Sequence, residues 1–214
     1  MTKSADRPAR VGLFGGTFDP PHVGHVTVAT DVADALELDR VLWMPAATSP
    51  FKVGEEGTDP PLRLEMARAA AEADPRFRVR DDELRRGGVS WTVDTLRALR
   101  RELGPDAPLY LILGADQLAS FDRWREAEEI LRLATPAIMD REGEDAGEAA
   151  PDLPGMERAV HVPVTRVDVS STRVRERIRA GEDVSTMVPD PVLRIVRREG
   201  LYRAAAPAAG AGDG

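Results

Sequence analysis

Cysteine is absent from the 214-residue chain. Its absence excludes disulfide bonds, catalysis by a thiolate and zinc sites built on thiolates, which leaves a hard metal ion held by oxygens as the metal option. Long apolar runs are missing too, and the charged N-terminus MTKSADRPAR lacks the apolar stretch of a secretory signal. We therefore expect a cytoplasmic protein that does not act in a membrane.

Basic residues are fewer than acidic ones. The chain has 29 Lys and Arg residues against 37 Asp and Glu residues, a formal net charge of -8. General binders of nucleic acids or of membrane surfaces need a basic face, so the composition disfavours both functions. A small anionic ligand remains compatible, because its site needs only local positive groups.

Apolar periodicity predicts strands that alternate with helices. Short apolar runs typical of buried strands lie at residues 11–14, 41–44, 77–79, 109–113, 137–139 and 160–164. Helical spacing or capping residues predict helices that begin at Gly24, at Asp59, at Ser90 or Thr92, near Trp124, at Arg173 and at Asp190. This alternation indicates an α/β fold, a doubly wound, Rossmann-like parallel sheet with helices on both faces and a small C-terminal helical part.

The length fits a single core, with 42% apolar residues to fill it. We expect a flexible N-terminus over residues 1–9, a single domain over residues 10–203 and a disordered tail over residues 204–214. Residues 140–156 mix Glu, Asp, Gly, Ala and Pro without periodicity, which predicts a mobile loop. In this fold class ligands bind beyond the carboxyl ends of the strands, so the turns after those ends are expected to form the site.

Residues 11–25, VGLFGGTFDPPHVGH, contain the highest concentration of candidate functional residues in the chain. Paired glycines between a strand and a helix let backbone N–H groups approach a phosphate at the helix N-terminus. A glycine pair alone more often only turns the chain, and this one matches neither the dinucleotide fingerprint nor the Walker motif. However, His22 and His25, two of the three histidines, stand at the mouth of the helix. Imidazoles at that place favour a phosphate site over zinc, for which no third ligand is near.

Two segments resemble the signatures of a known superfamily. Residues 15–25, GGTFDPPHVGH, resemble the first signature of the HxGH nucleotidyltransferases, and residues 169–175, VSSTRVR, resemble their SSTxxR signature. Within that superfamily the chain is most similar to the bacterial nicotinate-nucleotide adenylyltransferases, through SWTVDTL at 90–96, GAD at 114–116, the following Trp124 and the closing segment 188–202. The resemblance covers about residues 10–203. One departure is Phe51-Lys52, where the family often has His-Lys.

The resemblance implies adenylyl transfer from ATP to nicotinate mononucleotide in NAD biosynthesis, with Mg²⁺ bound mainly through the ATP phosphates and no metal ligand from the protein. It implies catalytic roles for His22, His25 and Arg175. It assigns ATP to Gly15, Gly16, Thr17, Phe18, Asp116, Ser170, Ser171 and Thr172. It assigns the acceptor to Lys52, Trp91, Thr92 and Trp124. The partners it implies are these two small molecules, with no nucleic acid and no membrane, and a homo-oligomer stays open.

Several of these residues also fit purely structural roles. Arg175 stands near the start of a helix, where a cation is unfavourable unless it serves an anion, whereas its neighbouring arginines fit an exposed face. Trp124 has helical spacing to Ala127 and Leu131 and equally fits a core position. Asp116 also fits a helix cap.

The function has alternatives as well. The same chemistry on nicotinamide mononucleotide or phosphopantetheine is the first. A helix N-terminus at Trp91 and Thr92 favours an anion over a neutral amide, hence nicotinate. A non-catalytic nucleotide sensor is disfavoured by the retained histidines and Arg175. A dehydrogenase is disfavoured by the absent dinucleotide fingerprint.

Overall fold

The computed structural model describes residues 7–50, 57–141 and 150–204. Lys52, Phe51 and part of the predicted loop 140–156 therefore lie outside the described residues, as do most of both predicted terminal segments. Within the described part, one parallel sheet has the order β3-β2-β1-β4-β5-β6. Its strands are β1 (Val11–Gly16), β2 (Arg40–Pro45), β3 (Phe77–Val79), β4 (Leu109–Gly114), β5 (Thr135–Arg141) and β6 (Val160–Val164). The predicted doubly wound, Rossmann-like sheet is confirmed.

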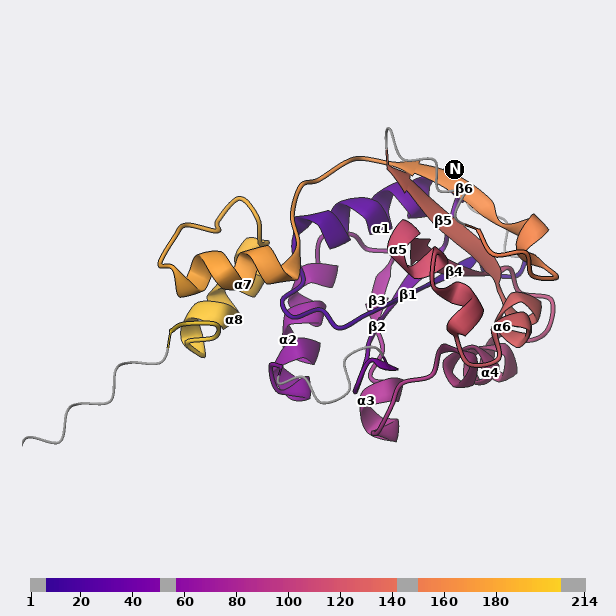
Figure 1. Cartoon of the computed structure of the whole chain (residues 1–214), viewed down its shortest axis with the longest axis horizontal. Helices are drawn as coiled ribbons and strands as arrows, with labels where there is room; N and C mark the ends of the chain where they lie inside the picture. The colour runs from indigo at the N-terminus through magenta and orange to yellow at the C-terminus, as the bar shows by residue number, and fades with distance from the viewer. Residues whose placement is uncertain (1–6, 51–56, 142–149, 205–214) are drawn as a thin grey trace, which may run out of the picture.

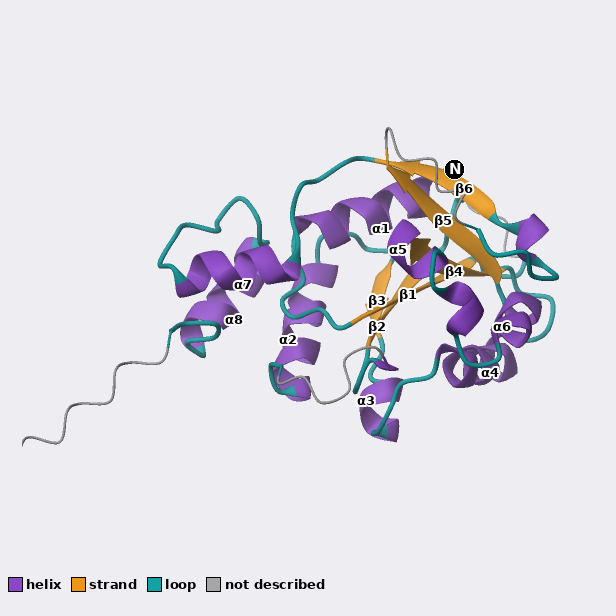
Figure 2. Cartoon of the chain, viewed as in Figure 1, coloured by secondary structure: helices purple, strands orange, loops and turns teal. Residues whose placement is uncertain are grey.

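Most of the helices connect these strands, and helices cover both faces of the sheet (Figure 2). They are α1 (Val23–Ala35), α2 (Pro60–Ala71), α3 (Asp82–Arg86), α4 (Thr92–Leu103), α5 (Ala115–Leu118), α6 (Ala127–Leu133), α7 (Ser171–Arg179) and α8 (Asp190–Arg198), with 3-10 turns η2 (Phe121–Arg123) and η4 (Met156–Arg158). In Figure 1, α7 and α8 form the predicted C-terminal helical part, at one end of the molecule beyond α1 and α2. None of the helices in the described ranges has the length and apolarity needed to cross a membrane.

The sheet separates two apolar cores. Side chains alternate between its faces, so that Phe14 of β1 packs in one core and its neighbour Leu13 in the other. The first core, called the α1 side here, takes apolar residues from α1, α2, α7 and α8. The second, called the α4 side, takes them from α4, η2 and α6. Burial on both faces explains why the strands read as continuous apolar runs rather than as alternating ones.

The predicted helix around Trp124 is wrong at its start. Trp124 follows η2 in an extended conformation, with φ -72° and ψ 144°. Helix α6 begins only at Ala127, because Glu126 takes a left-handed conformation with φ 56°. The helical spacing of Trp124 to later apolar residues therefore does not reflect a shared helix.

Two helix starts differ from the predicted caps. Trp91, not Ser90 or Thr92, is the N-cap residue of α4. Asp59 is the N-cap residue of α2 as predicted, although its side chain makes no cap bond. Helix α8 starts at Asp190 after the N-cap residue Pro189. The single-turn helix α3 was not predicted, because five residues are too few to show a helical period.

Candidate functional site

The loop after β1 carries the first signature at the carboxyl edge of the sheet. The ring of Phe18 turns inward and packs on Phe14 and Trp43, with ring centroids 5.7 and 5.0 Å apart. A Cβ atom on Gly16 would lie 3.0 Å from the Phe18 ring, so a larger residue would force the ring to shift. Phe18 is only 2% exposed. The buried ring cannot reach ATP, so the predicted contact of Phe18 with ATP can only be made by its backbone.

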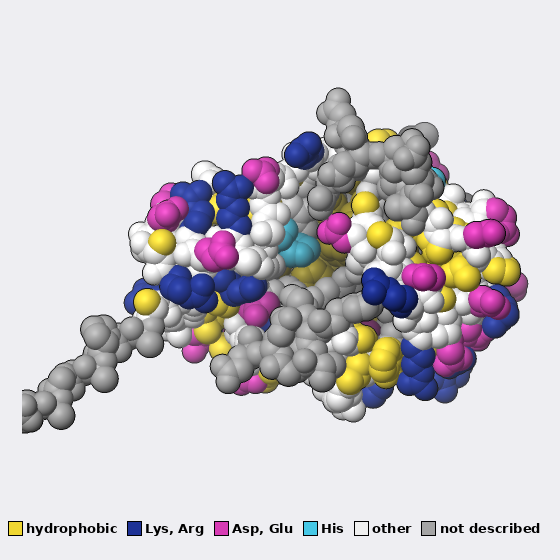
Figure 3. All heavy atoms as spheres, in the orientation of Figure 1, with side chains coloured by type: hydrophobic (Ala, Val, Ile, Leu, Met, Phe, Trp, Pro, Cys, Tyr) yellow, Lys and Arg dark blue, Asp and Glu magenta, His cyan; other side chains and the backbone are white. Residues whose placement is uncertain are grey.

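His22 and His25 face each other at the start of α1. Their ring centroids lie 3.7 Å apart, and the backbone N–H of His22 donates to Nδ1 of His25 over 3.1 Å. Because Nδ1 of His25 accepts this bond, its neutral ring carries the proton on Nε2. Figure 3 shows histidine side chains in the hollow between the α7 region and the body of the molecule. The structure thus brings the two predicted residues together.

Burial keeps both imidazoles neutral. It lowers the pKa of His22 to about 4. It also lowers the pKa of His25 well below its usual value, and the adjacent His22 adds to that shift. Desolvation disfavours the charged form of each ring, and two cations at this distance would repel each other. At neutral pH the pair therefore offers N–H donors rather than full positive charges.

The second signature contacts the first through main-chain oxygens. Nη1 of Arg175 donates to the carbonyl oxygen of Asp19 over 2.8 Å, and Oγ of Ser171 donates to that of Pro20 over 2.9 Å. Ser170 is the N-cap residue of α7. Residues separated by about 150 positions in the sequence therefore form one structure around the β1 loop.

Gly24 makes this approach of the two signatures sterically possible. A Cβ atom at Gly24 would lie 2.9 Å from Cγ1 of Val169 and 3.1 Å from Nδ1 of His22. The first of these neighbours belongs to the segment that leads into α7. A larger residue at position 24 would push the second signature away from the histidines.

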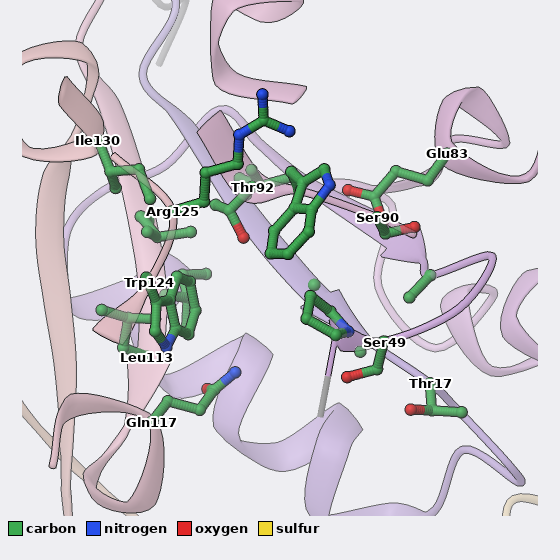
Figure 4. A pocket seen from close by; sticks show the side chains of 18 of the residues that line it. Thr17, Ser49, Glu83, Ser90, Thr92, Leu113, Gln117, Trp124, Arg125 and Ile130 are labelled. Atoms are coloured by element: carbon green, nitrogen blue, oxygen red, sulfur yellow. The ribbon is translucent and has the colours of Figure 1, made fainter. Parts of the chain in front are cut away.

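A cavity of about 400 Å³ opens on the α4 side of the site. The predicted residues Gly15, Gly16, Thr17, Trp91, Thr92 and Trp124 line it. Figure 4 shows Thr17 and Ser49 on one side of the cavity and Trp124 and Gln117 on another. Trp124 is partly exposed, and it both lines the cavity and packs against the α4-side core, so features of both sequence interpretations are present.

Charged side chains that the sequence analysis missed also line this cavity. Arg123 and Arg125 directly precede and follow Trp124 in the sequence. The guanidinium of Arg125 lies 5.4 Å from the ring centroid of Trp91. This distance fits a cation–π contact. Their place next to Trp124 was the one available signal in the sequence.

A buried carboxylate forms part of the same wall. Glu83 of α3 accepts a hydrogen bond of 2.6 Å from Oγ1 of Thr95, and burial raises the pKa of Glu83. Ser90 Oγ accepts from the backbone N–H of Ala47 over 2.9 Å, which ties the start of α4 to the loop after β2. A polar Thr95 in the apolar stripe of α4 was the signal for this group in the sequence.

A second, smaller cavity of about 230 Å³ lies beside the first. Thr17 and Ser49 border both cavities, and Asp19, Thr58, Arg63 and Arg175 are among the other residues of the smaller one. Arg63, 3% exposed, donates to the carbonyl oxygens of Thr17, Ala47 and Thr58 over 2.8, 3.1 and 3.1 Å. The sequence analysis missed Arg63, which has no recognisable motif around it.

Several predicted residues lie away from the cavities. Asp116 is exposed on α5, and Ser170 and Thr172 are exposed at the start of α7. In the part of the chain that the structure describes, none of the three lines either cavity. Thr172 Oγ1 does accept a hydrogen bond of 3.3 Å from Nη2 of Arg175.

Comparisons with known proteins agree with this architecture. Residues 13–177 match the cytidylyltransferase-like family. A probable nicotinate-nucleotide adenylyltransferase of Roseiflexus sp. is 42% identical over 203 residues, which cover 91% of this chain and 98% of that protein. Another from Marinobacter nauticus is 40% identical over 209 residues, covering 90% of this chain and 96% of that protein.

A solved structure is also similar to the fold. The Plasmodium falciparum nicotinic acid mononucleotide adenylyltransferase complexed with NaAD matches with a TM-score of 0.73 at 17% identity, over 91% of this chain and 97% of that one. At this identity the likeness shows the shared fold alone. The chain covers 98% and 96% of the two sequence relatives. It therefore belongs to the cytidylyltransferase-like family and, within it, to the nicotinate-nucleotide adenylyltransferases, which are nucleotidyltransferase enzymes.

Proposed function

We propose that the chain transfers the adenylyl group of ATP to nicotinate mononucleotide in NAD biosynthesis. The products are nicotinate adenine dinucleotide and pyrophosphate. The observation that carries the proposal is the meeting of both signatures at the β1 loop, beside a cavity lined by Trp91 and Trp124. An aromatic cavity of this size suits a pyridine ring.

The reaction places few chemical demands on the protein. A phosphate oxygen of the mononucleotide attacks the α-phosphorus of ATP, and the bond from that phosphorus to the β-phosphate oxygen breaks as pyrophosphate leaves. No covalent enzyme intermediate forms, so the rate depends on positioning and on neutralising charge. The donors assembled here are the backbone of Gly15 to Thr17, the neutral His22 and His25, and the guanidinium of Arg175.

We assign the two ends of the triphosphate to different donors. The N–H groups of His22 and His25 meet oxygens around the α-phosphate and the leaving pyrophosphate. Arg175, with the hydroxyls of Ser171 and Thr172 at the start of α7, holds the β and γ oxygens. Ser170, Phe18 through its backbone, and Asp116 complete the proposed ATP contacts, and Lys52 remains a proposed phosphate contact of the acceptor.

The acceptor cavity favours an anionic ring substituent. Helix α4 begins at Thr92, so its N-terminal backbone N–H groups, around Trp91 and Thr92, suit the nicotinate carboxylate. Arg123 and Arg125 add positive charge to a lining in which Glu83 is the one carboxylate among the described residues. A neutral amide would gain less from these groups, and this difference supports nicotinate over nicotinamide. In this proposal Trp124 stacks on the pyridine ring.

Mg²⁺ fits this site as an ion carried by the nucleotide. The described residues contain no group of three or more His, Asp or Glu side chains placed to hold a metal. Mg²⁺ keeps several waters and commonly binds through substrate phosphates, where it neutralises their charge. Arg175 and the histidines then act on the oxygens that remain accessible.

The test is an acceptor panel. Purified protein is incubated with ATP, Mg²⁺ and either nicotinate mononucleotide, nicotinamide mononucleotide or phosphopantetheine, and pyrophosphate and the adenylylated product are quantified. We expect the highest kcat/KM with nicotinate mononucleotide. A better rate with another acceptor contradicts the acceptor assignment, and ATP binding without pyrophosphate release from any acceptor indicates a nucleotide sensor.

A further inference from the structure

The C-terminal segment reaches the first signature through a single side chain. After α8 ends, the chain turns back, and the hydroxyl of Tyr202 donates to Oδ1 of Asp19 over 2.6 Å. The same hydroxyl lies 3.9 Å from Sδ of Met66 on α2. Residues that are 183 positions apart are thus joined next to the histidine loop.

Asp19 is the point where several segments of the site meet. Its other carboxylate oxygen accepts a hydrogen bond of 3.2 Å from the backbone N–H of Thr58. Its carbonyl oxygen accepts the bond from Arg175 described above. Asp19 is 7% exposed. The contacts of this one residue therefore connect the β1 loop to α7, to the start of α2 and to the C-terminal segment.

The backbone is strained at both ends of the Tyr202–Asp19 contact. Tyr202 has φ 64°, and Phe18, directly before Asp19, has φ 52°. Side chains rarely adopt this left-handed region, and such residues persist only where their surroundings hold them. Burial and the bond to Asp19 raise the pKa of the Tyr202 hydroxyl, which keeps it protonated as a donor at neutral pH.

We propose that Tyr202 is a positioning residue for adenylyl transfer. It acts through Asp19 to fix the loop from Thr17 to Pro21, which leads directly into His22 and accepts the bond from Arg175. Without the hydroxyl, the Asp19 side chain keeps only its bond to Thr58 among the partners found here, and the loop that aligns the phosphate donors gains freedom. This inference rests on the proposed function, since its effect is read in that reaction.

Tyr202→Phe is the direct test, because it removes one oxygen and keeps the ring. Tyr110→Phe is the matched control, since Tyr110 is the other tyrosine of the chain and its hydroxyl accepts a bond of 2.8 Å from Arg10, near the start of β4. We expect kcat/KM for ATP to fall about tenfold in Tyr202→Phe, as for loss of one hydrogen bond to a charged group. KM for the acceptor and the activity of Tyr110→Phe stay unchanged.

A double variant separates positioning from packing. If Tyr202 acts through Asp19, adding Tyr202→Phe to Asp19→Asn lowers kcat/KM no further than Asp19→Asn does alone. Multiplying losses would overturn the proposal, and so would a Tyr202→Phe protein with a lower Tm but parental kinetics. A parent that lacks turnover with every acceptor overturns the proposed function and this inference with it. If the parent is active and Tyr202→Phe has the same kcat/KM, the inference alone is overturned.

Discussion

His25 accepts the backbone N–H of His22 on Nδ1, and this bond leaves Nε2 as the only N–H donor of the His25 ring. This bond lies within the first turn of α1, so the helix start itself helps to orient the His25 ring. The arrangement allows the acceptor role of His25 to be separated from its donor role by mutation.

His25→Asn is predicted to lower kcat by about 10² to 10³, the usual cost of losing a donor to transition-state charge. The Asn Oδ1 can still accept from the backbone N–H of His22, so the free energy of unfolding should change by no more than about 2 kcal/mol. Steady-state kinetics and urea unfolding measure both. The control is His161→Asn, which removes an exposed histidine of β6. If stability and turnover fall in parallel in His25→Asn, the histidine is structural.

Stability is predicted to fall as the pH is lowered from about 6.5 to about 4. The unfolded chain protonates His22 near its ordinary pKa of 6.5, whereas the folded protein does so only at about 4, so protons favour the unfolded state between these values. The stabilisation lost over this range is about 3 kcal/mol, and it is fully present above pH 6.5.

Urea unfolding at pH 7, 6 and 5 measures this dependence largely above the range in which ordinary carboxylates titrate. We expect His22→Gln to reduce the slope but not to abolish it, because burial also lowers the pKa of His25. His161→Gln, which removes the exposed histidine of β6, is the control. An unchanged slope in His22→Gln would show that other groups cause the acid sensitivity.

Trp124→Leu is predicted to raise KM for nicotinate mononucleotide about tenfold while KM for ATP changes less than about twofold, because loss of a stacked aromatic face costs on the order of 1 kcal/mol. Trp124→Phe, which keeps an aromatic face, should lie between the parent and Trp124→Leu. Initial rates with each substrate varied in turn provide both constants. An equal rise in both KM values would place Trp124 outside the acceptor site.

Arg63→Met is predicted to lower the free energy of unfolding by about 3 kcal/mol, because three carbonyl oxygens of the site loops lose a charged donor at once. Arg68→Met, at an exposed position of the same helix α2, should stay within about 0.5 kcal/mol of the parent. Chemical denaturation compares the two variants. Similar values for both would mean that solvent replaces Arg63 in these bonds.

Local patterns were sufficient to predict the sheet. Strands buried on both faces need continuous apolar runs, and the run from Leu109 to Leu113 indicated β4 without any knowledge of its neighbours. The error at Trp124 has the opposite origin. A three-residue turn followed by a left-handed Glu126 imitates helical spacing in the sequence, and only the folded backbone separates the two cases.

The site was predictable where short motifs carry it. The contact between the two signatures follows from strand ends meeting at one edge of the sheet, as the fold class requires. Arg63 and Tyr202 were not predictable, because their bonds to Thr17 and Asp19 span 46 and 183 positions. Such partners leave no periodic or spacing signal in a single sequence.

The division of the core by the sheet has a consequence for how this enzyme can diverge. The side chains of Trp91 and Trp124 pack on the α4-side core, whereas α1 and α7, which carry the histidines and Arg175, pack on the α1-side core. Substitutions in the proposed acceptor wall would therefore be accommodated by a different core from the one that supports the proposed triphosphate donors. Under the proposed assignment, acceptor preference could therefore change by substitution on one side of the sheet while the phosphate-binding residues on the other side stay unchanged.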